Sequence, residues 1–118
     1  MKKKVLIADR CKFFRAELKK MLIELGHEVV AEVSTGSKVF LEYAATRPDL
    51  VILELIFPDK NGIEIATRIM GIESKTKIVI CSGSGNERFI RKALFEGVSS
   101  YLVKPITKAH LEAELNNI

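Results

Sequence analysis

The sequence lacks several features that would place it in a special class of protein. It contains no tryptophan and no glutamine, and no apolar run approaches the about 20 residues that cross a bilayer. Only a short apolar segment, Val5 to Ala8, follows the N-terminal Met-Lys-Lys-Lys, and this is too short for the core of a signal peptide. We therefore expect neither a membrane span nor a secretory leader.

Cysteine and histidine are also scarce. Cys11 and Cys81 have no metal-site spacing, so we expect two reduced thiols and a cytoplasmic protein. His27 and His110 have no ligand partners at useful spacing, and we expect both at the surface. The net charge is +4, and the lysines and arginines are scattered, which favours a solvated surface over nucleic-acid binding.

The residues that are present suit one globular unit. The chain has 118 residues, of which 47% are hydrophobic and 29% are charged, enough for one core and a polar surface. No repeat, linker or low-complexity segment interrupts it. We therefore expect residues 1–118 to form a single domain, with no attached effector domain.

Short apolar segments alternate with helical patterns along the whole chain. The third such segment, Leu50 to Leu53, is an unbroken apolar run of the kind that is buried on both faces of a sheet. Strands that alternate with helices predict an α/β fold, a doubly wound parallel sheet covered by helices on both faces. The expected strands are 4–8, 28–33, 50–53, 77–81 and 99–103, each followed by a helix.

Polar residues stand where four of these strands end. Asp9 follows the first strand, Glu54 the third, Ser82 the fourth and Lys104 the fifth. Because these strand ends converge at one edge of a doubly wound sheet, we expect the four side chains in one pocket. Carboxylates can hold Mg²⁺, whereas a hydroxyl and an ammonium can bind phosphoryl oxygens. The set therefore predicts phosphoryl-transfer chemistry, although Asp9 could also simply cap the first helix.

The segments around these residues resemble the receiver domains of two-component response regulators, most closely the single-domain chemotaxis type. The resemblance covers the whole chain, and it implies a flavodoxin-like (βα)5 fold with strand order 2-1-3-4-5 and a signalling role without enzymatic activity. It rests on Val-Leu-Ile-Ala-Asp at 5–9, Pro-Asp-Leu-Val-Ile-Leu-Glu at 48–54, Pro-Asp-Lys-Asn-Gly at 58–62, Cys-Ser-Gly at 81–83 and Tyr-Leu-Val-Lys-Pro-Ile at 101–106.

The resemblance also implies roles for individual residues. Ser82 matches the switch hydroxyl of the family, and Lys104 matches the lysine that contacts the phosphoryl group. Tyr101 matches an aromatic residue that changes rotamer on activation. The backbone carbonyl of Ile56 would complete the metal site, and the Lys104-Pro105 peptide bond would be cis.

The same resemblance implies an interaction surface on the fourth helix, fifth strand and fifth helix, with Ile90, Leu94 and Tyr101 on it. Its partner would be a histidine kinase, an effector or a second copy of the chain. From the helical pattern alone, we expect Phe89, Ile90 and Leu94 to be mostly buried and Phe95 to lie partly outside.

Two residues depart from the family pattern. Ala8 stands where the family usually has the first of two adjacent acids, and Glu54 stands at the aspartate that accepts phosphate. The extra methylene moves the carboxylate by about 1.5 Å, and a misplacement of about 1 Å can cost on the order of 100-fold in a positioned reaction. The longer side chain can reach Lys104 and imitate part of a phosphoryl charge. We therefore expect a Glu54–Lys104 ion pair and weak or absent Mg²⁺ binding.

Three functions follow as hypotheses. The first is an atypical receiver domain that acts as a phosphorylation-independent or constitutively set protein-interaction module. The second is a working phosphorylation switch in which Asp9, Asp59 or Ser82 accepts phosphate. The third is a flavodoxin-like enzyme or nucleotide binder, which is disfavoured because Asp9-Arg10-Cys11 replaces a glycine-rich loop after the first strand.

Overall fold

Five parallel strands form one sheet in the order β2-β1-β3-β4-β5, in a computed structural model that describes residues 1–118. This confirms the predicted doubly wound α/β fold and its 2-1-3-4-5 order. The one irregularity of register lies between Val5 and Leu6, where β1 pairs with β2. The strands are β1 (Lys4–Ala8), β2 (Glu28–Val33), β3 (Leu50–Leu53), β4 (Lys77–Ser82) and β5 (Ser100–Val103).

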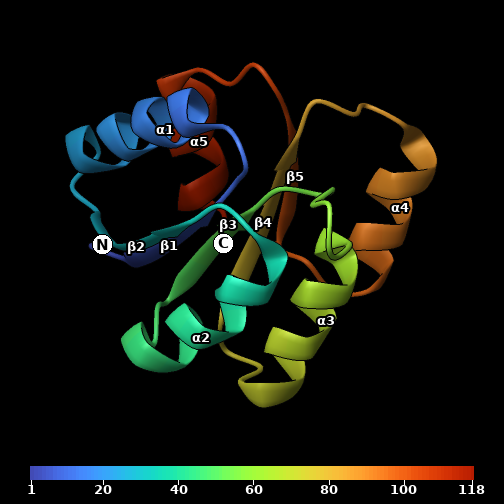
Figure 1. Cartoon of the computed structure of the whole chain (residues 1–118). Helices are drawn as coiled ribbons and strands as arrows, with labels where there is room; N and C mark the ends of the chain where they lie inside the picture. The colour runs from blue at the N-terminus through green and yellow to red at the C-terminus, as the bar shows by residue number, and fades with distance from the viewer.

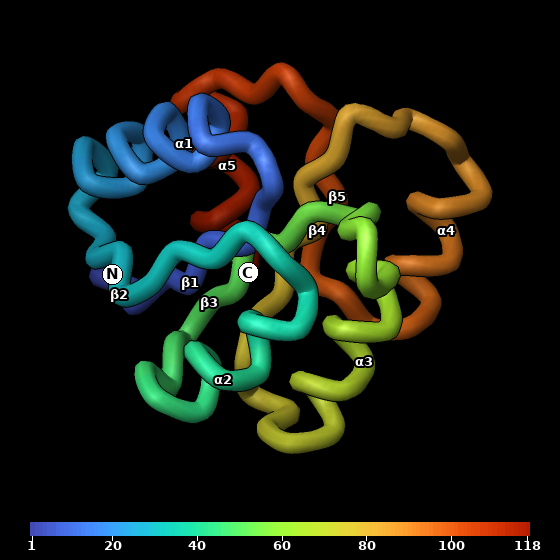
Figure 2. Tube along the Cα trace, viewed as in Figure 1, coloured from blue at the N-terminus to red at the C-terminus, as the bar shows by residue number.

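The helices cover both faces of the sheet (Figures 1 and 2). One face carries α1 and α5, and the other carries α2, α3 and α4. No helix is long and apolar enough to cross a membrane. The helices are α1 (Lys12–Glu24), α2 (Gly36–Thr46), α3 (Gly62–Ile72), α4 (Glu87–Phe95) and α5 (Lys108–Asn116).

The apolar runs in the central strands are buried because successive side chains point to opposite faces of the sheet. In β1, Leu6 and Ala8 join the core under α2 and α3, whereas Val5 and Ile7 join the core under α1 and α5. All four residues are at most 1% exposed. This double-sided packing fixes the strand ends, and therefore fixes the origin of every loop at the carboxyl edge.

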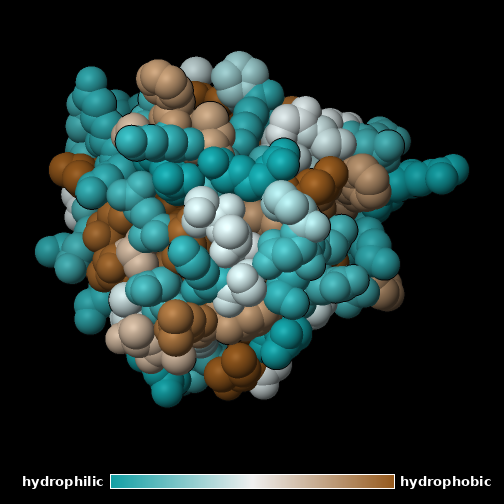
Figure 3. Space-filling view, in the orientation of Figure 1, coloured by the Kyte–Doolittle hydropathy of each residue, from teal (hydrophilic) through white to brown (hydrophobic).

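The expectation that Phe89, Ile90 and Leu94 of α4 are mostly buried was wrong. Phe89 and Leu94 are 39% and 48% exposed, Ile90 is half-buried, and only Ala93 of this helix is fully buried. The helix packs beside β5, the edge strand, so only a narrow stripe of it contacts the sheet. Phe95 lies outside as expected, with 88% of its surface exposed. Figure 3 shows scattered hydrophobic groups on one face of the molecule, separated by hydrophilic side chains.

His27 also differs from the expectation, whereas His110 is exposed as predicted. His27 is half-buried, and its Nδ1 accepts a hydrogen bond of 3.0 Å from the Lys3 backbone N–H. Its pKa is lowered, first by burial and then by the positive charge of Lys3. The ring therefore ties the start of β1 to the start of β2 and is not a free surface group.

The two cysteines provide a direct test of the fold. Cys11 is exposed, whereas Cys81 lies inside β4, and burial raises the pKa of its thiol to about 12. Iodoacetamide at mildly alkaline pH should therefore add one group to the native protein, at Cys11, and two groups to the denatured protein. Intact mass before and after denaturation measures this. A native Cys11→Ser variant that still gains a group would contradict the burial of Cys81.

Candidate functional site

Asp9, Glu54, Ser82 and Lys104 line one open pocket at the carboxyl edge of the sheet, as the sequence predicted. The pocket has a volume of about 490 Å³. Each of the four side chains follows or ends a different strand, so the sheet itself sets their spacing. The other residues that line the pocket are Arg10, Cys11, Ile56, Gly83 and Ser84.

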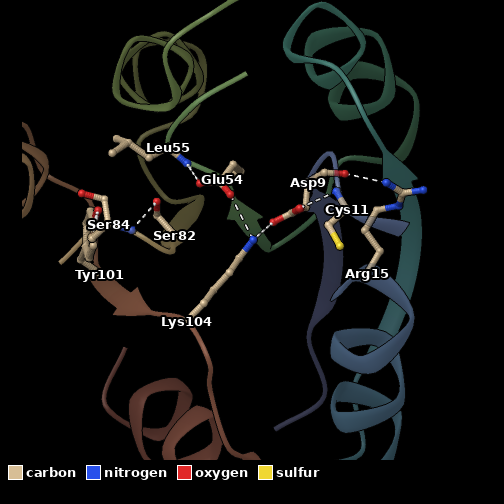
Figure 4. Close-up of polar contacts among 9 residues, drawn as sticks. All are labelled: Asp9, Cys11, Arg15, Glu54, Leu55, Ser82, Ser84, Tyr101 and Lys104. Carbon is tan, nitrogen blue, oxygen red and sulfur yellow. Dashed lines mark hydrogen bonds and ion pairs between the residues drawn. The ribbon is translucent and has the colours of Figure 1, made fainter. Parts of the chain in front are cut away.

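The Lys104 ammonium lies between the two carboxylates (Figure 4). Its Nζ is 2.6 Å from Asp9 Oδ2 and 3.0 Å from Glu54 Oε1. The second contact confirms the expected Glu54–Lys104 ion pair. The first contact was not expected, because the sequence does not show how far the fifth strand lies from the first. We refer to Asp9, Glu54 and Lys104 together as the ionic bridge.

The remaining carboxylate oxygens also have donors. Asp9 Oδ1 accepts a 2.8 Å hydrogen bond from the Cys11 backbone N–H, and Glu54 Oε2 accepts one of 2.7 Å from the Leu55 backbone N–H. All four oxygens are therefore hydrogen-bonded, which offsets the cost of burying side chains that are only 3% and 13% exposed. Cys11 is itself the N-cap residue of α1, so Asp9 holds the turn before this helix.

The charges of the bridge stabilise one another. Burial by itself lowers the pKa of Lys104, but the hydrogen bonds and negative charges of Asp9 and Glu54 outweigh it, so the pKa is raised. Lys104 is therefore an ammonium at all physiological pH values. Two negative charges and one positive charge leave the bridge with a net negative charge.

Arg15 holds the backbone of Asp9 in the ionic bridge, a role that the sequence analysis did not predict. Its Nη1 donates a 2.6 Å hydrogen bond to the Asp9 backbone carbonyl, while its Nε lies 3.5 Å from Glu32 Oε1. Because Arg15 lies one turn into α1, this bond joins the helix to the end of β1. Its spacing of six residues from Asp9 was the only available signal, and such a spacing is common.

The other side of the pocket is held by the loop between β4 and α4. Ser82 Oγ accepts a 3.2 Å hydrogen bond from the Ser84 N–H, and the Tyr101 hydroxyl donates one of 2.7 Å to the Ser84 carbonyl. Burial raises the pKa of Tyr101, so its hydroxyl keeps the proton that it donates. Figure 4 shows the three side chains on the opposite side of Glu54 from Asp9. The resemblance implied roles for Ser82 and Tyr101 but none for Ser84.

Two further expectations concern the loops that follow β3 and β5. The Lys104-Pro105 peptide bond is cis, as expected. Ile56 lines the pocket with a side chain that is 51% exposed, and its residue pairs with Asn61 in an isolated bridge. This backbone pairing of Ile56 with Asn61 closes the turn after β3 and so fixes the backbone at Ile56.

Asp59 does not line the pocket. Its two carboxylate oxygens accept hydrogen bonds of 3.1 and 2.9 Å from the N–H groups of Gly36 and Ser37, at the start of α2. The N-cap residue Thr35 makes no capping bond through its side chain. Asp59 thus caps α2 from a distant loop and joins the loops after β2 and β3.

The residues of the pocket do not fit Mg²⁺ in this arrangement. No group of three or more His, Cys, Asp or Glu side chains is placed to hold a metal ion. Mg²⁺ requires near-ideal octahedral oxygen ligands. Each carboxylate oxygen already accepts a hydrogen bond, and the Lys104 ammonium lies between the two carboxylates. The Lys104 ammonium would therefore compete with a divalent ion for the two carboxylates.

Comparison with known proteins agrees with the geometry. The sequence model of the response regulator receiver domain matches residues 5–116. The chemotaxis protein CheY of Thermotoga maritima is 32% identical over 118 residues, which cover 100% of this chain and 98% of that protein. CheY of Bacillus subtilis is 32% identical over 105 residues, which cover 89% and 88% of the two chains.

Solved structures show the same flavodoxin/CheY-like fold. A response regulator receiver domain protein from Clostridium thermocellum has a TM-score of 0.88 at 27% identity, covering 97% of this chain and 91% of its own. The CheX–CheY–BeF₃–Mg complex from Borrelia burgdorferi has a TM-score of 0.90 at 23% identity, with coverages of 95% and 85%. The latter likeness concerns the fold alone.

Removal of Lys104 should destabilise the protein. The variant Lys104→Met leaves two adjacent, largely buried carboxylates without their cation, so the free energy of unfolding should fall by about 2–3 kcal/mol. Urea denaturation measures the change. The matched control is Lys108→Met, because Lys108 pairs with Glu24 at 3.8 Å where both side chains are about half exposed. This control should change stability by less than about 0.5 kcal/mol.

The stabilisation of the folded protein by Lys104 should be lost at strongly alkaline pH. Its pKa in the folded state is raised above the usual 10.5, so its contribution is fully present below that pH. The contribution is lost as the pH rises through the folded-state value. The stability difference between the unmodified protein and Lys104→Met should therefore narrow at strongly alkaline pH. A difference that widens there, or equal losses in Lys104→Met and Lys108→Met at neutral pH, would contradict the bridge.

Proposed function

The chain belongs to the response regulator receiver domain family, and we propose that it acts as an atypical, phosphorylation-independent receiver that signals through contacts with other proteins. We take residues 1–118 as the receiver domain and its role as non-enzymatic. The observation that carries the proposal is the position of Lys104 Nζ, bonded to Asp9 and Glu54 at once. A cytoplasmic location, as expected from the reduced cysteines, is part of the proposal.

The ionic bridge opposes phosphorylation for three reasons. Each oxygen of Glu54, the phosphoacceptor equivalent, already accepts a hydrogen bond, one of them from the Lys104 ammonium, which lowers the nucleophilicity of the carboxylate. Its carboxylate lies one methylene further from the backbone than an aspartate would place it. Ala8 supplies no second acid, so Mg²⁺ binding is weak at most, and the remaining carboxylates are shared with Lys104.

The bridge also supports a constitutively set state. Glu54 presents one negative charge to Lys104, where a phosphoryl group would present nearly two. On the other side of the pocket, Tyr101 is bonded to Ser84, which fixes one arrangement of the loop before α4. Asp9, Glu54 and Tyr101 thus each have hydrogen-bond partners within the chain, which supports one set arrangement of the pocket.

The interaction surface would be the face formed by α4, β5 and α5. Leu94 is 48% exposed there, and Ile90 and Tyr101 are half-buried, so an apolar partner could cover them. The CheY of Borrelia burgdorferi forms a complex with CheX. By analogy, the partner of this chain would be a protein such as a histidine kinase, an effector or a second copy.

A working switch with another acceptor is the competing function. Asp9 is part of the bridge, and Asp59 caps α2 away from the pocket, which leaves both poorly placed. The Ser82 hydroxyl does line the pocket. Membership of the receiver family favours signalling over the flavodoxin-like enzyme or nucleotide binder.

Reversing the two departures from the family pattern should restore phosphorylation. Glu54→Asp returns the carboxylate to the family position, and Ala8→Asp adds the missing acid. The double variant should gain one phosphoryl group from acetyl phosphate and Mg²⁺, and Glu54→Asp alone should gain less. Ala8→Asp alone should gain none, because the acceptor is still misplaced. Intact mass, with EDTA during the reaction as a control, measures the gain.

The unmodified protein is the decisive control. It should gain no mass under the same conditions. A phosphoryl group on the unmodified protein would refute the phosphorylation-independent reading, and peptide mapping would then show whether Ser82, Asp9, Asp59 or Glu54 carries it. A folded double variant that stays inert would show that the pocket differs from a working receiver beyond these two positions.

A further inference from the structure

The Lys104 ammonium has a third neighbour besides its two carboxylates. The centroid of the Phe14 ring lies 4.1 Å from Nζ. An ammonium carries three N–H donors, and in this pocket two of them are used by Asp9 and Glu54. The face of an aromatic ring attracts a cation within about 6 Å through its quadrupole. Phe14 therefore occupies a side of the ammonium that water or an anion would otherwise take.

Phe14 is well placed to hold this position. It lies in the first turn of α1, and it is half-buried against the core that also contains Leu18 and Ile7. That packing leaves the ring little freedom to swing away. Its neighbour Phe13 is 83% exposed, so the two adjacent aromatic residues differ in environment although they share a helix. The side chain of Lys104 is only 19% exposed, and limited contact with water strengthens the attraction to the ring.

We propose that Phe14 is a positioning residue that holds the Lys104 ammonium against Asp9 and Glu54, and so sets how readily these carboxylates are released to an incoming cation. The inference rests on the proposed function, in which Lys104 competes for the two carboxylates. It adds a contact from α1 to the ionic bridge, whose three members follow β1, β3 and β5. Nothing in the family pattern described above assigns a role to this position.

The test compares the mobility of Lys104 in four variants by relaxation of its side-chain ¹³Cε signal. In the unmodified protein, the Lys104 side chain should be ordered. Phe14→Leu and Phe14→Met remove the ring while keeping an apolar side chain, and both should make Lys104 mobile. Phe14→Tyr keeps the ring and should leave it ordered, and so should Phe13→Leu on the exposed side of the helix. Thermal unfolding of each variant confirms that it is folded.

Mg²⁺ itself is the probe of carboxylate release. Its apparent affinity follows from titration of the Cys11 and Leu55 amide signals, because these N–H groups bond to the two carboxylates. Phe14→Leu should tighten Mg²⁺ binding by about fivefold, the equivalent of one cation–π contact. In a Lys104→Met background, the same substitution should change the affinity by less than about twofold, because the ring then has no cation to hold. A purely structural role of Phe14 would give the same change in both backgrounds.

The outcomes separate the inference from the function on which it rests. Lys104→Met alone should tighten Mg²⁺ binding, and no change would overturn the competition on which the proposed function depends. Tighter binding in Lys104→Met together with unchanged order and affinity in Phe14→Leu would overturn the role of Phe14 alone. An equal effect of Phe13→Leu and Phe14→Leu would also overturn it.

Discussion

The structure of the site depends on one constraint: two carboxylates are buried within reach of each other, and a single ammonium must compensate both. Burying either acid alone would cost several kcal/mol. Lys104 meets this constraint with bonds of 2.6 and 3.0 Å, and backbone N–H groups take the remaining oxygens. The Asp9 end of this arrangement is held in turn by the Cys11 N–H and by Arg15.

The parallel sheet is what brings the groups together. β1 and β3 are neighbours in the sheet, so Asp9 and Glu54 leave adjacent strand ends. β5 lies two strands beyond β3, and the long lysine side chain covers that distance from the edge. The extra methylene of Glu54 fits the same frame, because it lets one oxygen meet Lys104 while the other turns back to the N–H of Leu55. Glu54 departs from the family pattern, yet each of its carboxylate oxygens has a hydrogen-bond donor.

Local sequence patterns predicted much of the fold and of the pocket. The alternating apolar segments predicted the strands, and the polar residues that end them predicted the membership of the pocket. The contacts between distant loops could not be predicted in the same way. Asp9 meets Lys104 across 95 positions of sequence, and Asp59 caps a helix that begins 23 positions earlier. The exposure of Phe89 and Leu94 likewise depends on α4 lying at the sheet edge, which periodicity does not encode.

The most direct test of the account is a crystal structure of the unmodified protein grown with excess Mg²⁺ and beryllofluoride. The account predicts that Lys104 Nζ stays within hydrogen-bonding distance of both Asp9 and Glu54, with no metal ion between them. A Mg²⁺ ion held by Asp9 and Glu54, with Lys104 turned away to a bound fluoride, would contradict it. Such a site would show that the ionic bridge opens as readily as the pocket of a working phosphorylation switch.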